Sequence, residues 1–180
     1  MIVMSSEKKE KLILLGHSGS GKDFLRRGLV KLGLKYSPKF TTRPKRKLEE
    51  EGVDYNFITI QDFENLNTNG QIKVFQEFLI SGQIWTYGIS KDNWEQNQLF
   101  IMTRHELEQI DLEERKNCFV VFLNIDVETR KKRLLKRNDQ NDSIDRRIKA
   151  DEEDFKDFRD YDLSITDPEF ESEWIYDIMN

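Results

Sequence analysis

The sequence of 180 residues has little cysteine, proline and histidine, and these scarcities narrow the classes of protein to consider. Its single cysteine, Cys118, cannot form an intramolecular disulfide, and its place in the apolar run 118–123 predicts a packing role. No apolar run approaches the ~18–20 residues of a membrane span, and the N-terminal apolar stretch is too short for a secretory signal. We therefore expect a cytoplasmic chain that does not enter a membrane and whose length suits one domain.

Positive charge is also scarce overall, since the net charge is −5, but it is unevenly distributed. The last thirty residues, from Asp151, carry twelve acidic and two basic side chains. The positive charge of the remainder is concentrated in Lys39–Lys47 and Arg130–Lys149. Two short basic clusters in an acidic chain favour small anionic ligands over nucleic acid, which requires a broad basic surface.

Apolar runs that suit strands alternate with amphipathic stretches that suit helices, and this order predicts an α/β fold around a mainly parallel sheet. The predicted strands are Leu12–Leu15, Leu99–Thr103, Phe119–Ile125 and Leu163–Thr166. The predicted helices are Asp23–Leu32, Arg104–Ile110, Val127–Lys136, Ser143–Phe158 and Pro168–Ile178. Between residues 36 and 90, short aromatic and β-branched runs separated by glycines predict a small antiparallel unit with one helix near Ile60–Leu66.

The stretch Gly16–Phe24, with sequence GHSGSGKDF, follows the first strand and opens the first helix. Glycines at this spacing let successive backbone N–H groups converge on phosphate oxygens, and Lys22 adds a positive charge. The usual pattern has Ser or Thr after the lysine, whereas this chain has Asp23. The sequence predicts a nucleotide phosphate site; a simple glycine-rich turn does not explain the position of Lys22.

A second group of polar residues follows in the segment Thr41–Arg46. Arg43 and Arg46 flank Pro44, which stiffens the chain and can hold both guanidinium groups on one anion. A solvated basic turn is the alternative. Further along, Glu77 lies in a predicted strand, where a lone glutamate normally faces water.

These motifs occur in the order found in guanylate kinases, and over nearly its whole length the chain resembles that family. The motif residues are the loop 16–22, Thr41–Arg46, Glu49, Gly52, Asp54, Tyr55, Phe57, Phe75, Glu77, Tyr87, Gly88, Lys132–Leu134, Arg137 and Arg147. The resemblance implies a P-loop kinase core with a mainly parallel five-stranded sheet flanked by helices, an inserted small mixed or antiparallel subdomain that binds a nucleoside monophosphate, and a helical lid. It assigns the core to residues 1–35 and 91–180, the lid to about 137–148 and the inserted subdomain to 36–90.

The resemblance also implies roles for individual residues. The phosphates of ATP would bind Gly16, Ser18, Gly19, Ser20, Gly21, Lys22 and Asp23. The acceptor monophosphate would bind Lys39, Arg43, Arg46, Tyr55, Glu77, Tyr87, Gly88 and Thr103, with Glu77 accepting from the N1–H and 2-amino groups of guanine. The catalytic residues would be Lys22, Arg133, Arg137 and Arg147, which neutralise the transferring phosphoryl group.

Three positions depart from the family pattern and affect the base and the metal. Lys39 stands where the family has serine, and it can donate to guanine O6. Thr103 stands where an aspartate serves base and metal, and the strand 99–103 carries no acid. We expect Asp23, a hard oxygen ligand, to take part of the role of positioning the Mg²⁺ that accompanies ATP.

The expected function is therefore ATP-dependent phosphorylation of GMP or dGMP by direct in-line transfer, a transferase activity of nucleotide metabolism. One alternative keeps the reaction and changes the acceptor to another or a modified purine monophosphate, because Lys39 and Thr103 alter the pocket. A second alternative is a non-catalytic guanylate-kinase-like module that binds phosphoproteins, although the retention of Lys22 and the lid arginines speaks against it. The sequence leaves open whether the protein is a monomer or a dimer.

Overall fold

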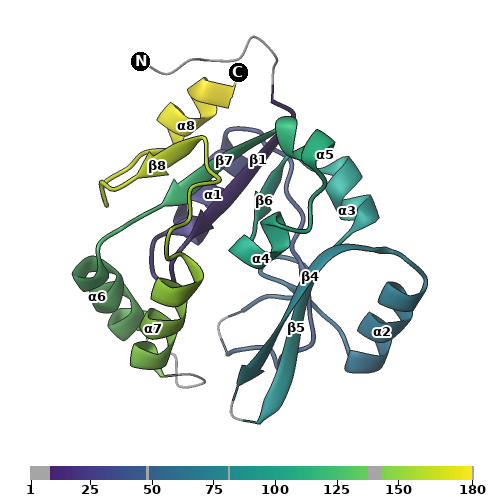
Figure 1. The fold of residues 1–180 in the computed structure, drawn as a ribbon. Coiled ribbons are helices and arrows are strands. Elements are labelled where there is room, and N and C mark those ends of the chain that lie inside the picture. The colour runs from purple at the N-terminus through teal and green to yellow at the C-terminus, as the bar shows by residue number, and fades with distance from the viewer. Residues whose placement is uncertain (1–8, 48, 81, 138–142, 180) are drawn as a thin grey trace.

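A computed structural model of the chain describes residues 9–47, 49–80, 82–137 and 143–179 (Figure 1). Its strands are β1 (Lys11–Gly16), β2 (Phe40–Thr41), β3 (Asn56–Phe57), β4 (Ile72–Ile80), β5 (Gln83–Ser90), β6 (Leu99–Ile101), β7 (Cys118–Leu123) and β8 (Leu163–Ile165). Its helices are α1 (Lys22–Lys31), α2 (Ile60–Thr68), α3 (Lys91–Gln96), α4 (Arg104–Leu107), α5 (Leu112–Lys116), α6 (Val127–Arg137), α7 (Ile144–Asp154) and α8 (Ser172–Met179). None of these helices has the length and apolar character needed to cross a membrane.

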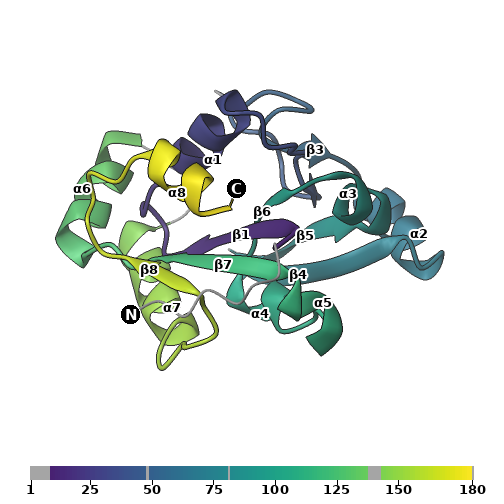
Figure 2. The same cartoon turned by 90° about the horizontal axis from the view of Figure 1, so that it is seen from above.

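The core sheet has the strand order β6-β1-β7-β8, and every neighbouring pair is parallel, which confirms the predicted α/β core. Leu12 and Leu14 of β1 face one apolar cluster, whereas Ile13 and Leu15 face another. Helices α1 and α8 cover the first face, and α4, α5 and α7 lie on the second (Figure 2). A sheet buried on both faces explains why its strands are continuously apolar.

The expected fifth strand of the core sheet is reduced, in the described residues, to a single parallel bridge between Tyr36 and Leu99. Pro38 follows two residues after Tyr36 and has no N–H to donate. The carbonyl oxygens of Ser37 and Pro38 accept from the side-chain amide of Asn93, at 3.3 Å and 3.2 Å, and the pairing with β6 stops after one bridge.

The second sheet has the order β3-β2-β5-β4 and is mixed, with one parallel pair and a long antiparallel hairpin of β4 and β5. Helix α2 begins at a capping box, in which Thr59 and Asp62 satisfy each other's backbone N–H groups.

The division between a core and an inserted subdomain at residues 36–90 stays a prediction.

Several local predictions were wrong. Helices α3 and α5 were not predicted, because each is only one to two turns long and depends on a single polar cap, Ser90 or Asp111. The last helix begins at Ser172 instead of Pro168. Asp167 accepts a hydrogen bond from the N–H of Glu169, and the resulting turn lets Phe170 bury its ring before the helix starts.

Candidate active site

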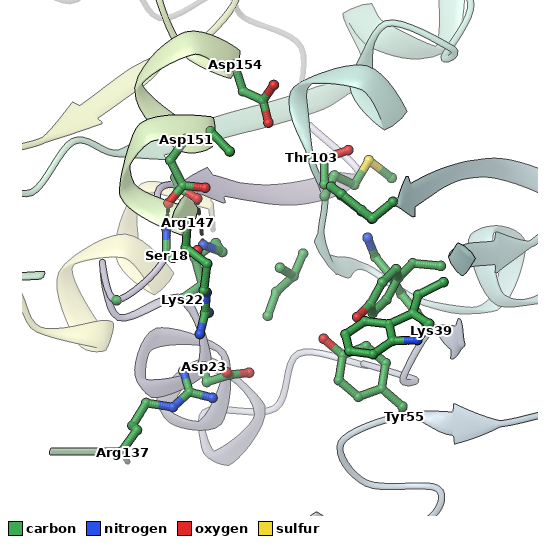
Figure 3. A pocket seen from close by; sticks show the side chains of 18 of the residues that line it. Ser18, Lys22, Asp23, Lys39, Tyr55, Thr103, Arg137, Arg147, Asp151 and Asp154 are labelled. Atoms are coloured by element: carbon green, nitrogen blue, oxygen red, sulfur yellow. Dashed lines mark hydrogen bonds between the residues drawn. The ribbon is translucent and has the colours of Figure 1, made fainter. Parts of the chain in front are cut away.

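A cavity of about 520 Å³ lies between the glycine loop, helices α6 and α7, and the second sheet (Figure 3). It brings together most of the predicted site residues: Gly16, Ser18, Gly19, Gly21, Lys22, Asp23, Lys39, Arg43, Arg46, Tyr55, Tyr87, Thr103, Arg133, Arg137 and Arg147. Ser20, Glu77 and Gly88 do not line it. We call the side with the glycine loop the phosphate end, and the side with Lys39, Phe78 and Thr103 the base end.

The glycine loop needs its glycines for backbone geometry. Gly19 and Gly21 have φ angles of 78° and 105°, in the left-handed region that side chains disfavour. A Cβ on Gly19 would lie 2.8 Å from the carbonyl oxygen of Arg130. The ammonium of Lys22 donates to the carbonyl oxygens of Gly16 at 2.6 Å and His17 at 2.9 Å, so the lysine is folded against its own loop.

A carboxylate from helix α7 reaches this loop. The N–H of Ser18 donates to Asp151 Oδ2 at 2.5 Å (Figure 3). Arg130 lies behind this carboxylate, and its side chain is 1% exposed. It donates to the carbonyl of Ile125 at 2.9 Å and pairs with Glu152. Sequence reasoning missed Asp151 and Arg130, because an acidic run and a helical arginine both have the pattern of a solvated helix face.

The charge of Lys22 is held in an unfavourable environment. Burial lowers the pKa of Lys22 to about 8, against the opposing charge of Asp151. Burial also lowers the pKa of His17, whose ring lies 4.9 Å from that of Phe155. A phosphate group near Lys22 would supply the negative charge that the site lacks.

Asp23 has a cationic neighbour within its own helix. Its carboxylate lies 3.6 Å from Arg26, which is buried and also lies 4.0 Å from Asp54. The side chain of Asp23 is 61% exposed and lines the cavity next to Lys22. In the described residues no group of three or more His, Cys, Asp or Glu could hold a metal ion. One exposed carboxylate therefore fits a supporting oxygen ligand for Mg²⁺ that arrives with a nucleotide, but not a resident metal site.

Arg43 is fixed in place by two kinds of contact. It is 3% exposed and its two terminal nitrogens both bind the carboxylate of Glu49, one of them at 2.7 Å. Its guanidinium carbon lies 4.8 Å from the ring centre of Tyr55. Burial alone would lower the pKa of Arg43, but the hydrogen bonds to Glu49 raise it above its ordinary value. The carboxylate also accepts from the N–H of Arg46 at 2.9 Å, so it organises the whole turn.

Tyr55 and Tyr87 lie beside these arginines, with ring centres 5.7 Å apart. Burial raises the pKa of both phenols, which keeps their hydroxyl groups protonated and able to donate at neutral pH. Two arginines and two tyrosines thus supply hydrogen-bond donors and positive charge of the kind that suits a phosphate dianion.

The base end is mostly apolar and aromatic. Phe78 and Trp85 form a cross-strand pair on the cavity face of the β4–β5 hairpin, next to Ile80. Glu77 pairs with Thr86 on the opposite face and is exposed, because successive strand residues point to opposite sides. Glu77 therefore does not line the cavity, and its base-reading role stays a prediction.

The base end does contain one ion pair. The ammonium of Lys39 binds Glu106 Oε2, and Glu106 is completely buried. The same carboxylate oxygen accepts from the N–H of Thr103 at 2.8 Å, and Thr103 in turn caps helix α4. Sequence reasoning missed Glu106, although the pattern Thr103-x-x-Glu106 is a capping-box signature that predicts a helix start there.

The predicted lid arginines occupy two different settings. Arg133 donates to the loop carbonyl of Ser20 and to that of Pro168, each at 3.0 Å. Arg137 and Arg147 line the cavity next to Lys22 and Asp23 (Figure 3). Residues 138–142 of the predicted lid lie outside the described residues.

Comparisons with known proteins agree on one family. The sequence matches the family described as guanylate kinase over residues 8–176. A guanylate kinase of Coxiella burnetii is 31% identical over 177 residues, covering 91% of this chain and 82% of the relative. One of Streptococcus pyogenes serotype M3 is 30% identical over 171 residues, covering 91% and 81%. The crystal structure of guanylate kinase from Anaplasma phagocytophilum aligns with a TM-score of 0.67 at 22% identity over 96% of this chain and 86% of that chain, which shows a shared fold.

Proposed function

The chain belongs to the guanylate kinase family, and from this membership we propose that it transfers the terminal phosphoryl group of ATP to GMP or dGMP. It is a nucleoside monophosphate kinase, and its acceptor is the part of the assignment that we propose. One observation carries the proposal: one cavity is lined both by a glycine loop with Lys22 and by the Arg43–Tyr55–Tyr87 donor set. Two phosphate sites that face one cavity suit direct transfer between two nucleotides.

In the proposed reaction the glycine loop binds the phosphates of ATP through its N–H groups and Lys22. Arg43, Arg46, Tyr55 and Tyr87 hold the phosphate of the acceptor, whose ionised oxygen attacks in line. Arg43 enters this task already oriented by Glu49, so little side-chain entropy is lost when the acceptor binds. No general base is needed, because the attacking phosphate oxygen carries its charge beforehand.

Arginines from α6 and α7 complete the proposed mechanism. Arg133, Arg137 and Arg147 neutralise charge on the transferring group, a contribution that can reach ~10³–10⁵ in rate. Arg133 donates to the loop carbonyl of Ser20, which fits a role in aligning the loop with the phosphoryl group.

Mg²⁺ bound with ATP would neutralise the phosphates and fix their geometry, and Asp23 would support it directly or through water. The alternative role of Asp23 is its ion pair with Arg26. Replacing Asp23 by Ser, the residue usual at this place, separates the two. We expect the Mg²⁺ concentration for half-maximal rate to change several-fold; an unchanged Mg²⁺ dependence with a lower melting temperature would leave only the ion pair.

A second candidate keeps the reaction and changes the acceptor to another purine monophosphate. The exposed position of Glu77 favours it, because the cavity then lacks the carboxylate expected to recognise the N1–H and 2-amino groups of guanine. Phe78 and Trp85 offer stacking surfaces that every base can use.

ADP formation with each acceptor tests both candidates. GMP, dGMP, dAMP, dTMP and modified purine monophosphates are compared at equal concentration with ATP and Mg²⁺, and Lys22→Ala serves as the inactive control. Fastest turnover with GMP or dGMP supports the first candidate, and a different purine supports the second. Turnover with none of them would contradict the proposal and favour a phosphate-binding module.

A further inference from the structure

Glu106 is a buried charge that the proposed reaction does not use. Its side chain has no exposed surface and does not line the cavity. Burying a carboxylate is costly unless it is paired and hydrogen-bonded. Lys39 supplies the pairing charge, and the N–H of Thr103 supplies a hydrogen bond at 2.8 Å to the same oxygen. Its other oxygen, Oε1, has no hydrogen-bond partner among the described residues.

Lys39 connects this buried carboxylate to the cavity. Its side chain is 13% exposed, and it lines the cavity together with Thr103. An ammonium carries three N–H donors and cannot accept. The described structure shows one hydrogen bond from Lys39, to Glu106, so further donors remain for a ligand. Lysine has a long, flexible side chain, and a fixed anchor behind it defines where those donors lie.

The two departures from the family pattern at the base end, Lys39 and Thr103, are connected through Glu106. A lysine replaces the expected serine at position 39, and the acid expected at position 103 is replaced by Thr103, while Glu106 supplies a carboxylate three residues later. Thr103 and Glu106 form the capping box that begins α4, so the carboxylate is anchored by the helix start itself. The carboxylate of Glu106 therefore lies outside the cavity, and the ammonium of Lys39 lies between this carboxylate and the ligand.

We propose that Glu106 is a positioning residue that holds Lys39 as the base-recognising donor. This inference rests on the proposed function and specifies the acceptor. Lys39 donates to an acceptor atom at position 6 of a purine, so 6-oxopurine monophosphates bind and a 6-aminopurine is rejected, since its amino group meets another donor. The 2-amino group is not recognised, because Glu77 points away from the cavity. GMP and IMP are therefore near-equal acceptors.

Steady-state rates with GMP, IMP and AMP test the inference on the full chain. For the wild type we expect kcat/KM values for GMP and IMP within about fivefold of each other, and a value for AMP at least ~100-fold lower. Glu106→Gln keeps the size and the capping oxygen but removes the charge that holds Lys39. We expect it to raise the KM for GMP about 10-fold, to leave the KM for ATP unchanged, and to reduce the preference for GMP over AMP about 10-fold.

The matched control is Glu114→Gln, which breaks the Lys73–Glu114 pair outside the cavity and should leave the acceptor preference unchanged. The double variant K39Q/E106Q removes both charges together, leaves no unpaired buried ion, and should show the same loss of preference even if the single variant folds poorly. If Glu106 had only a structural role, Glu106→Gln would lower the melting temperature, as Glu114→Gln would, without changing the ratio of kcat/KM for GMP to that for AMP.

Different results distinguish a failure of the inferred role of the Lys39–Glu106 pair from a failure of the proposed kinase function. Turnover of GMP with more than about tenfold discrimination against IMP, or a GMP to AMP ratio that survives K39Q/E106Q, would overturn the role of the Lys39–Glu106 pair and leave the kinase assignment intact. Failure of every purine monophosphate to be phosphorylated would overturn the proposed function, and the inference with it.

Discussion

The two ends of the cavity are built from different materials. At the phosphate end, the glycine loop contributes backbone N–H groups and left-handed glycine torsion angles, and Lys22 is folded against the loop carbonyls. At the base end, the site consists of side chains whose direction depends on strand register and on a helix cap. A sequence motif specifies a backbone site almost completely, whereas a side-chain site can be lost by a one-residue change of face.

The largest expected effect on activity comes from Lys22→Met at the phosphate end. We expect phosphoryl transfer to fall at least ~10³-fold. The nucleotide-free protein should become more stable by up to about 3 kcal/mol at pH 7, because burial lowers the pKa of Lys22 to about 8 and keeping it charged there costs free energy. Single-turnover rates and urea unfolding measure the two effects.

Lys31→Met, at an exposed position of the same helix, is the control for both measurements. A Lys22→Met variant that keeps activity within tenfold of the wild type would show that the loop does not depend on this charge.

Between the two ends, the acceptor phosphate site should respond to Arg43→Lys. Lysine cannot make the two-point contact with Glu49 or stack on Tyr55. We expect the KM for the acceptor to rise roughly 10–100-fold with little change in the KM for ATP. Arg115→Lys, which alters an arginine paired with Asp160 and Asp162 outside the cavity, is the matched control. Equal effects of the two substitutions would argue against a phosphate role for Arg43.

The base end offers two neighbouring positions on opposite faces of one hairpin. Trp85→Ala removes a stacking surface in the cavity and should raise the KM for the acceptor about 10-fold. Glu77→Gln changes an exposed side chain on the other face and should alter kcat/KM less than about threefold. Steady-state kinetics with GMP distinguish them, and the reverse order of effects would mean that the hairpin presents its other face to the base.

The smallest expected effect is a pH dependence at the phosphate end. Lys22 loses its proton above pH 8 in the nucleotide-free protein, and ATP phosphates favour the charged form. The affinity for ATP should therefore fall by up to ~10-fold between pH 8 and pH 9, with proton uptake on binding. Calorimetry at pH 9 in two buffers of different ionisation enthalpy measures the uptake, and Lys22→Met should show none. Release of a proton would contradict the assigned direction of the pKa change.

Much of the core could be predicted from the sequence, because apolar strands and amphipathic helices have strong periodicities. Strand β1 and helix α1 illustrate this, since Leu12–Leu15 lies inside β1 and the glycine loop connects the two. The edge strand was not predictable in the same way, because a single bridge between Tyr36 and Leu99 leaves no periodic pattern in the sequence. The short helices α3 and α5 were missed, since a few residues carry too little periodic signal.

The residues of the candidate site also divide into those that the sequence motifs located and those that they did not. The loop glycines, Lys22 and the Arg43–Tyr55 group lie where the motifs indicated. Glu77 does not, because a motif gives the order of residues but not the face of a strand. Glu106 and Asp151 act through partners 67 and 133 residues away in the chain, and no local pattern reveals such pairings.

The contact between Asp151 and the N–H of Ser18 makes ATP binding an exchange of one anion for another. A phosphate oxygen that takes this N–H must displace a carboxylate that belongs to helix α7. Arg147 lies four residues earlier on the same helix, so the element that gives up the contact with the loop also carries one of the arginines of the proposed reaction.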